Sequence, residues 1–143
     1  TGSPVTTSGN LNAEVNLTNA TGSLGANQNM SSLGSYTDGP SAANGTTGTW
    51  FASGTITIND TSASAANFYC KLYDGGSKIA ASANVVHPAA ANLRTTVSLS
   101  GTISAPAGNI RIACAPQDTT TGVMEFNRTG NSKDSTVTAF RLN

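Results

Sequence analysis

The feature that most constrains this chain is the strict alternation of the stretch from Gly48 to Asp60, which reads GTWFASGTITIND. One alternate set is small or apolar and consists of Trp50, Ala52, Gly54, Ile56 and Ile58. Residues two apart in an extended chain lie on the same face, and β-branched side chains favour that conformation. The stretch is therefore predicted to be a long strand with one face in the core, around which the other strands pack.

The same two-residue period recurs along the rest of the chain. Seven further strands are predicted near residues 11–17, 68–74, 78–86, 93–103, 110–115, 122–128 and 135–142. The stretch 19–47 is rich in Gly, Asn, Ser and Thr and is predicted as a long loop, with a short strand near 32–37 as an option. About eight strands without any helical period predict an all-β, antiparallel β-sandwich of the jelly-roll type. An immunoglobulin-like sandwich is the alternative.

The composition limits how large the core can be and which classes of partner the chain can bind. Val, Leu, Ile and Phe make up about 25 residues of 143, while Ala contributes about 20, and the net charge is zero. We therefore expect an ordered but thin core that is completed by neighbouring subunits. Charged residues are only 10% of the chain and form no basic run. This argues against nucleic acid as a partner, and the lack of an apolar run of about 18 residues argues against membrane insertion.

The two cysteines are both expected to point inward. Cys70 shares its alternation with Phe68 and Leu72, and Cys114 shares its own with Ile110 and Ile112. A disulfide across the sandwich and two buried free thiols both agree with this parity, and the alternatives stay open here.

No residue pattern predicts catalysis, a cofactor or a metal. The chain has one histidine, His87, which precedes a proline and is interpreted as a turn residue. There is no G-x-S-x-G elbow, no Cys–His spacing typical of zinc and no calcium-binding loop. The carboxylates are spread over different predicted strands and turns, so the chain is predicted not to be an enzyme.

Three aromatic residues fall on the outward set of their strands, namely Phe51, Tyr69 and Tyr73. Exposed aromatic residues often mark partner surfaces. We expect these three at a subunit interface, most simply of a homotrimer. A sugar-stacking platform and a covering loop are the alternatives.

The first 35 residues are predicted to attach or interlock the protein. They contain an amphipathic strand whose inward set is Leu11, Ala13, Val15 and Leu17. Such a strand needs a partner for its apolar face and its backbone groups. We expect residues 1–35 to be an attachment segment and residues 36–143 to be the β-sandwich domain. The chain begins at Thr1 rather than at Met, and we expect it to be processed or part of a longer protein.

The run from Tyr36 to Leu142 resembles a small β domain of virion structural proteins of tailed phages. The pieces that carry the resemblance are YTDGP, GTWFASGTITI, KLYDG, SLSGTISAPAGNIRI and FNRTGNSKDSTVTAFRL. Such domains look like the trimeric jelly-roll heads of tumour-necrosis-factor and complement-C1q type. The resemblance implies a capsid decoration, head-fibre or tail-fibre protein.

Together these features predict a non-enzymatic structural protein on the virion surface, outside the cell. It would act through oligomeric assembly and N-terminal attachment, with itself and a major capsid or other virion protein as partners. One alternative is the tip of a tail fibre that binds a receptor or host surface glycan. The other is a secreted appendage subunit assembled by strand exchange.

Overall fold

The computed structural model describes residues 18–143, and these residues form ten strands and no helix. The strands are β1 (Asn19–Ser23), β2 (Gln28–Met30), β3 (Thr37–Ala42), β4 (Thr49–Asp60), β5 (Ala66–Tyr73), β6 (Ile79–His87), β7 (Arg94–Ser104), β8 (Ile110–Pro116), β9 (Gly122–Met124) and β10 (Thr136–Arg141). Since no described residue is helical, this part of the chain has no helix that could span a membrane.

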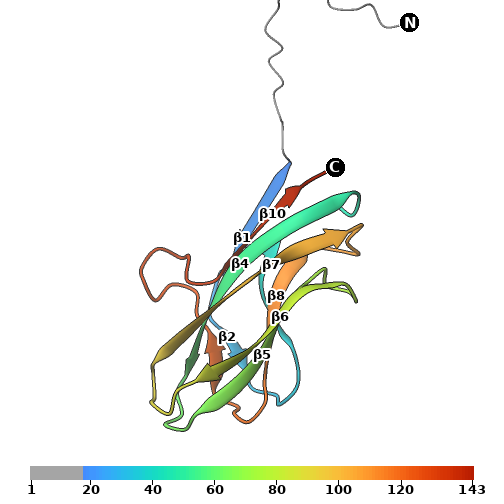
Figure 1. Ribbon diagram of the computed structural model, residues 1–143. Coiled ribbons are helices and arrows are strands. Elements are labelled where there is room, and N and C mark those ends of the chain that lie inside the picture. Colours follow the sequence, from blue (N-terminus) through green and yellow to red (C-terminus); the bar gives the residue numbers. More distant parts are fainter. Residues whose placement is uncertain (1–17) are drawn as a thin grey trace, which may run out of the picture.

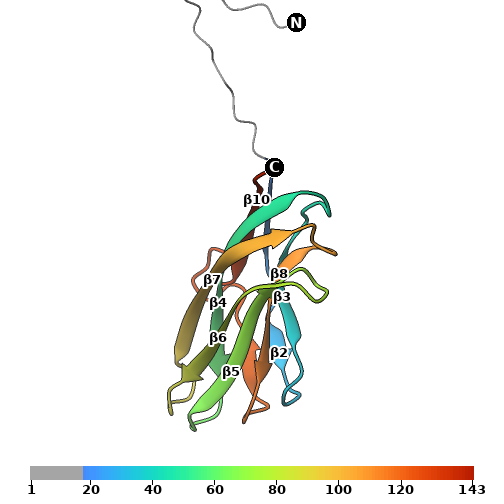
Figure 2. The same ribbon diagram turned by 45° about the vertical axis from the view of Figure 1, so that its right-hand side comes forward.

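The strands form two antiparallel sheets that pack face to face (Figures 1 and 2). Sheet A has six strands in the order β1-β10-β4-β9-β2, and β7 pairs with the other edge of β4. Sheet B has four strands in the order β3-β8-β5-β6. The predicted all-β, antiparallel sandwich is confirmed.

Strand β4 is the centre of sheet A. It pairs with β7 from Thr49 to Asn59 along one edge. Along its other edge it pairs first with β10 and then, from Ile58 to Asp60, with β9. Strands β9 and β10 therefore occupy one position in succession, as do β1 and β2 beyond them, and sheet A is four positions wide like sheet B.

The core lies between the sheets and follows the predicted alternation. All eight residues that the sequence predicts to be buried are 6% exposed or less, namely Trp50, Ile56, Ile58, Phe68, Leu72, Leu99, Ile110 and Ile112. Several inward positions are alanine, including Ala42, Ala52, Ala66 and Ala139. Small side chains therefore fill many of the inward positions, which keeps the core thin.

Two glycines let the sheets meet at the sides of the sandwich. A Cβ atom on Gly22 of β1 would lie 1.9 Å from the carbonyl oxygen of Ser41 in β3. A Cβ atom on Gly101 of β7 would lie 2.7 Å from the carbonyl oxygen of Ala80 in β6. Backbone packs directly on backbone at these points, so only glycine fits, and both sides of the sandwich are closed.

The expectation of a long loop over residues 19–47 is wrong. This stretch contains β1, β2 and β3, which belong to both sheets. Its strands are five, three and six residues long and are built mainly from Asn, Thr, Gly and Ser, so apolar alternation does not reveal them. Their pairing with β10, β9 and β8 overrides weak local propensity.

The sandwich begins earlier in the chain than the predicted boundary between residues 35 and 36. Residues 19–30 carry β1 and β2 and are part of sheet A, so sandwich structure begins before residue 36. The predicted attachment strand with Leu11, Ala13, Val15 and Leu17 lies outside the described residues.

Cys70 and Cys114 form a disulfide with an S–S distance of 2.05 Å. The two residues are direct register partners on β5 and β8, with Cα atoms 4.1 Å apart. The bridge thus joins neighbouring strands of sheet B and does not cross the sandwich as in antibody domains. Both residues are inward-facing, as their parity predicts, and neither is more than 1% exposed.

The Ile112→Ala variant tests the core. Removing this fully buried side chain should lower the free energy of unfolding by about 2–5 kcal/mol, because burial is lost and a cavity is left. Denaturant titration followed by Trp50 fluorescence gives the value. Ile79→Ala is the matched control, since Ile79 is 57% exposed, and its stability should stay within about 0.5 kcal/mol of the wild type.

Replacing both cysteines by alanine tests the disulfide. The bridge closes a sequence separation of 44 residues, so its removal should cost about 2–4 kcal/mol. The double variant should still show a β-sheet circular dichroism spectrum, because the ladder between β5 and β8 remains. An unchanged melting temperature without reductant would contradict this expectation.

Candidate functional site

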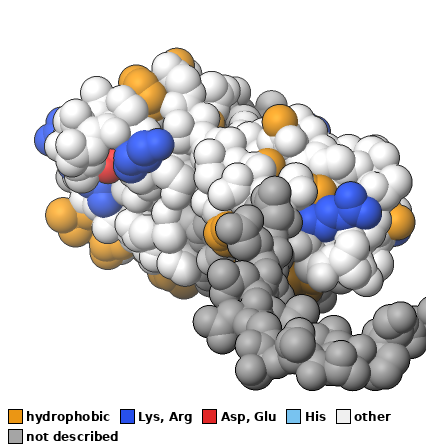
Figure 3. All heavy atoms as spheres, turned by 90° about the horizontal axis from the view of Figure 1, so that it is seen from above, with side chains coloured by type: hydrophobic (Ala, Val, Ile, Leu, Met, Phe, Trp, Pro, Cys, Tyr) orange, Lys and Arg blue, Asp and Glu red, His pale blue; other side chains and the backbone are white. Residues whose placement is uncertain are grey.

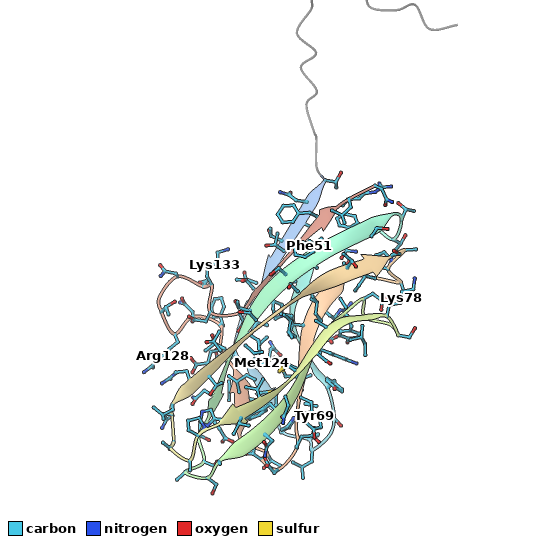
Figure 4. The ribbon with its side chains drawn as sticks, in the orientation of Figure 1. Phe51, Tyr69, Lys78, Met124, Arg128 and Lys133 are labelled. Atoms are coloured by element: carbon cyan, nitrogen blue, oxygen red, sulfur yellow. A yellow bond between two sulfur atoms is a disulfide. The ribbon has the colours of Figure 1, made fainter. Side chains whose placement is uncertain are left out.

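The outer face of sheet B carries the most distinctive surface of the described residues. Tyr69 projects outward from β5 and is 46% exposed (Figure 4). Tyr36 lies just before β3 and is 45% exposed. The ammonium group of Lys71, two residues after Tyr69 on β5, lies 4.1 Å from the ring centroids of both Tyr36 and Tyr73. This cation–π arrangement fixes a positive charge beside the aromatic rings of this face.

Tyr73 lies on this face but is not exposed, so the expectation of an exposed aromatic residue is wrong there. Its relative exposure is 8%, because Lys71 and the ion pair of Arg111 with Asp38 surround it. Its hydroxyl donates a hydrogen bond to Asp38 Oδ1 at 2.6 Å. Burial and the adjacent Asp38 carboxylate raise the pKa of Tyr73 to about 12. The sequence does not reveal this cover, since Asp38 and Arg111 are far apart along the chain.

Phe51 lies on the opposite outer face, that of sheet A (Figure 4). It is 37% exposed and pairs across the ladder with Phe140 of β10. The three predicted interface residues therefore do not form one patch. Tyr69 and Tyr73 belong to sheet B, and Phe51 belongs to sheet A with a neighbour that the alternation of residues 135–142 could have revealed.

The rest of the outer face of sheet A is covered by hydroxyl groups. The register of β4 with β7 and β10 places Ser53, Thr55 and Thr57 beside further Ser and Thr residues. Some of these contact each other directly, as do Thr57 Oγ1 and Thr96 Oγ1 at 3.1 Å. The outer face of sheet A is therefore polar but almost free of charge. At the end of the molecule where the C-terminus lies, hydrophobic and charged side chains are scattered among uncharged polar groups (Figure 3).

A buried polar cluster closes the other end of the sandwich. Asp60, the last residue of β4, is fully buried, and its Oδ1 accepts hydrogen bonds from Ser62 N at 2.8 Å and Thr121 Oγ1 at 2.6 Å. Burial alone would raise the pKa of Asp60, but these hydrogen bonds outweigh it and hold the pKa below its usual 3.8. The carboxylate therefore stays ionised and anchors the turn after β4.

His87 lies at the same end of the sandwich, and its ring contacts backbone carbonyl oxygens. It is the last residue of β6 and is fully buried, where the sequence predicts a turn residue. Its Nδ1 lies 3.0 Å from the carbonyl oxygen of Pro88, and its Nε2 lies 2.8 Å from that of Leu93. The ring thus holds the 88–93 turn, and none of its hydrogen-bond partners is a side-chain nucleophile.

Across the part of the chain that the structure describes, no group of three or more His, Cys, Asp and Glu residues is arranged to hold a metal ion. No family model and no curated protein matches this chain. The candidate functional features described here are two surfaces, the aromatic face of sheet B and the hydroxyl face of sheet A.

The carboxylate of Asp74 gives a prediction for acid stability. Its Oδ1 accepts the amides of Gly76 at 2.9 Å and Lys78 at 3.2 Å, and its Oδ2 accepts that of Ala107 at 2.8 Å. Burial would raise the pKa of Asp74, but the three amides lower it below 3.8 overall. The ionised group therefore stabilises the fold above about pH 4, and this stability is lost as the pH falls through the folded-state pKa.

The Asp74→Asn variant should be less stable than the wild type by about 1.5–3 kcal/mol at pH 7, because an amide cannot accept all three hydrogen bonds. Its stability should also fall less between pH 5 and pH 2, the range in which the wild-type carboxylate becomes protonated. Thermal unfolding measured across that range checks both points. Parallel curves for the two proteins would show that Asp74 does not contribute to acid unfolding.

Proposed function

We propose that this protein is a non-enzymatic structural protein displayed on the outside of a phage particle, as a capsid decoration or a head fibre. It acts through assembly of copies and through attachment by its N-terminal segment. The observation that carries this proposal is the order of the strands, taken with the resemblance of residues 36–142 to virion β domains.

The strand order supports a jelly roll. If β1 with β2 and β9 with β10 are each counted as one interrupted strand, residues 18–143 form eight strand positions. Their order is first-eighth-third-sixth in sheet A and second-seventh-fourth-fifth in sheet B. Two successive Greek keys produce this order, and the double-sheet jelly roll is common in viral capsid proteins.

The surface supports display in an aqueous exterior. Hydroxyl side chains cover the outer face of sheet A and favour strand conformation without adding charge. The disulfide agrees with an oxidising location. We therefore propose the virion surface as the location and a major capsid or other virion protein as the attachment partner.

The self-association that we propose for display is a homotrimer, as the resemblance implies. Phe51 and Tyr69 lie on different outer faces of the sandwich. A contact that buries both residues joins the outer face of sheet A in one copy to the outer face of sheet B in the next copy. Contacts between two different surfaces of this kind can close a ring. Tyr73 is not expected in this contact, because its side chain is already buried within its own chain.

Immunogold labelling of intact particles tests the proposal. Antibodies against residues 18–143 should label the outside of intact heads, because the domain is displayed. Removal of residues 1–17 should leave a folded domain that no longer binds the particle. Labelling of tails alone would favour the tail-fibre alternative, and labelling of free secreted filaments would contradict the proposal.

A second candidate function is the receptor- or glycan-binding tip of a tail fibre. The two half-exposed tyrosines of sheet B favour it, because aromatic rings stack on sugars. Binding on a glycan array that is lost in the Tyr69→Ala variant would support this candidate over the structural one.

The strand-exchange alternative has no support in the described residues. Such subunits leave a groove that a neighbour's strand fills. Here Gly22 lies against Ser41 on one side of the sandwich and Gly101 against Ala80 on the other, so both sides are closed.

A further inference from the structure

We propose that this protein binds an acidic saccharide, a sugar that carries a carboxylate group, in a hollow between residues 25–27 and residues 125–128. The hollow has a volume of about 560 Å³ and is lined by these two segments. Sites for small ligands typically measure about 300–1,000 Å³. This inference goes beyond the proposed function, because it depends neither on the particle nor on contacts between copies.

The hollow lies where sheet A is interrupted at two adjacent positions. β1 pairs with β10 and β2 pairs with β9, so the connections 24–27 and 125–135 leave the sheet side by side. Figure 4 shows Arg128 on the 125–135 loop, which projects from one side of the sandwich. Compact loops between rigid strands often carry function, because the strands hold the loop side chains in place.

The 125–135 loop is held in shape by its own side chains. The carboxylate of Asp134 accepts hydrogen bonds from the backbone amides of Arg128 and Thr129. Asn127 Oδ1 accepts a hydrogen bond from the backbone amide of Ser132 at 2.7 Å. The loop therefore has a defined shape before any ligand binds, which reduces the entropy that is lost on binding.

Two further contacts fix the walls of the hollow. Asn27 Oδ1 accepts a hydrogen bond from the backbone amide of Phe126 at 2.8 Å, which ties the β1–β2 connection to the 125–135 loop. The carboxylate of Glu125 is held by Arg94 of β7 through two contacts of 3.1 Å. Both walls are thus anchored to strands of sheet A.

These contacts leave hydrogen-bonding groups available at the hollow. They use the amide oxygens of Asn27 and Asn127, so the side-chain NH2 groups of both residues remain as donors. Within residues 18–143, the guanidinium group of Arg128 has neither a hydrogen-bond acceptor nor an ion-pair partner. Each carboxylate oxygen of Glu125 keeps a lone pair besides the one that faces Arg94.

This set of groups fits an acidic saccharide. A guanidinium group without a partner favours a carboxylate, which it binds through two parallel hydrogen bonds. Donor amides beside the Glu125 carboxylate favour hydroxyl groups, because a hydroxyl both accepts and donates. Phe126, which is partly buried against the core, supplies an apolar wall for a sugar ring. A bare phosphate would use the Arg128 charge but would be repelled by Glu125.

The test compares acidic sugars with neutral counterparts, using the full chain and isothermal titration calorimetry. The probes are digalacturonate with the neutral digalactose of the same linkage, and sialyllactose with lactose. The wild type should bind at least one acidic probe about tenfold or more tightly than its neutral counterpart, because only the carboxylate pairs with Arg128. Raising the salt concentration should weaken binding of the acidic probe alone. The two pairs distinguish a uronic acid from a sialic acid as the source of the carboxylate.

The Arg128→Gln variant gives the decisive result. It should bind the acidic probe about tenfold more weakly and the neutral probe as the wild type does, because only the charge-assisted pair is lost. Lys78→Gln is the matched control, since it removes the same charge on the opposite side of the molecule (Figure 4). The control should bind both probes like the wild type.

The Phe126→Ala variant tests the apolar wall. It should weaken binding of acidic and neutral probes alike, because the ring contacts the sugar and not its charge. Circular dichroism checks that each variant is folded. If Phe126→Ala does not fold, Phe126→Leu replaces it and should weaken binding in the same way.

Several outcomes would overturn the site. They are no binding of either acidic probe at about 10 mM, equal affinity for acidic and neutral probes, and binding that Arg128→Gln leaves unchanged. Inorganic phosphate that binds as tightly as the acidic sugars would show a simple anion site instead. Binding that is lost in Tyr69→Ala but kept in Arg128→Gln would assign the sugar to the face of sheet B. None of these results would change the expected labelling of particles, so the proposed display function is tested separately.

Discussion

The hydrogen-bonded ladder on both edges of β4 is the constraint on which the rest of the structure depends. Twelve residues, from Thr49 to Asp60, pair with β7 on one side and with β10 and then β9 on the other. Because the strand is shared by three neighbours, its register fixes theirs. A shift by one residue would turn Trp50, Ile56 and Ile58 to the solvent, so the buried face allows only one register.

The core contains few large side chains, and its stability depends on the close packing of the two sheets. Alanine and glycine at inward positions let the sheets come together, as Gly54 does where a Cβ would lie 2.9 Å from the side chain of Ile112. The disulfide between Cys70 and Cys114 then ties two central strands of sheet B. With fewer large side chains to bury, the chain depends on dense packing, and an enlarged side chain at such a glycine would force the layers apart.

The sequence predicts the strands with apolar alternation and misses those without it. The strands β4 to β8 and the buried set around Trp50 could be predicted, because period two and inward parity are local properties. Strands β1 to β3 could not, because their Asn, Thr, Gly and Ser residues become strands only through pairing with distant β10, β9 and β8. The outward position of Tyr69 follows from parity, whereas the burial of Tyr73 depends on Asp38 and Arg111, which only the folded sheet brings together.

The few charged side chains of this protein are mostly used to hold the backbone or each other. Asp74 binds three amides, Lys78 donates to the carbonyl oxygens of Ser104 and Ala105, and Arg94 pairs with Glu125 through two contacts of 3.1 Å. Only 10% of the chain is charged, against about 25% in an average domain. The charge pattern of an outer face therefore depends on very few side chains. On sheet B, Lys71 and Asp118 are likewise held by neighbouring groups of the same chain, Lys71 over the ring of Tyr36 and Asp118 by the backbone amide of Asn67.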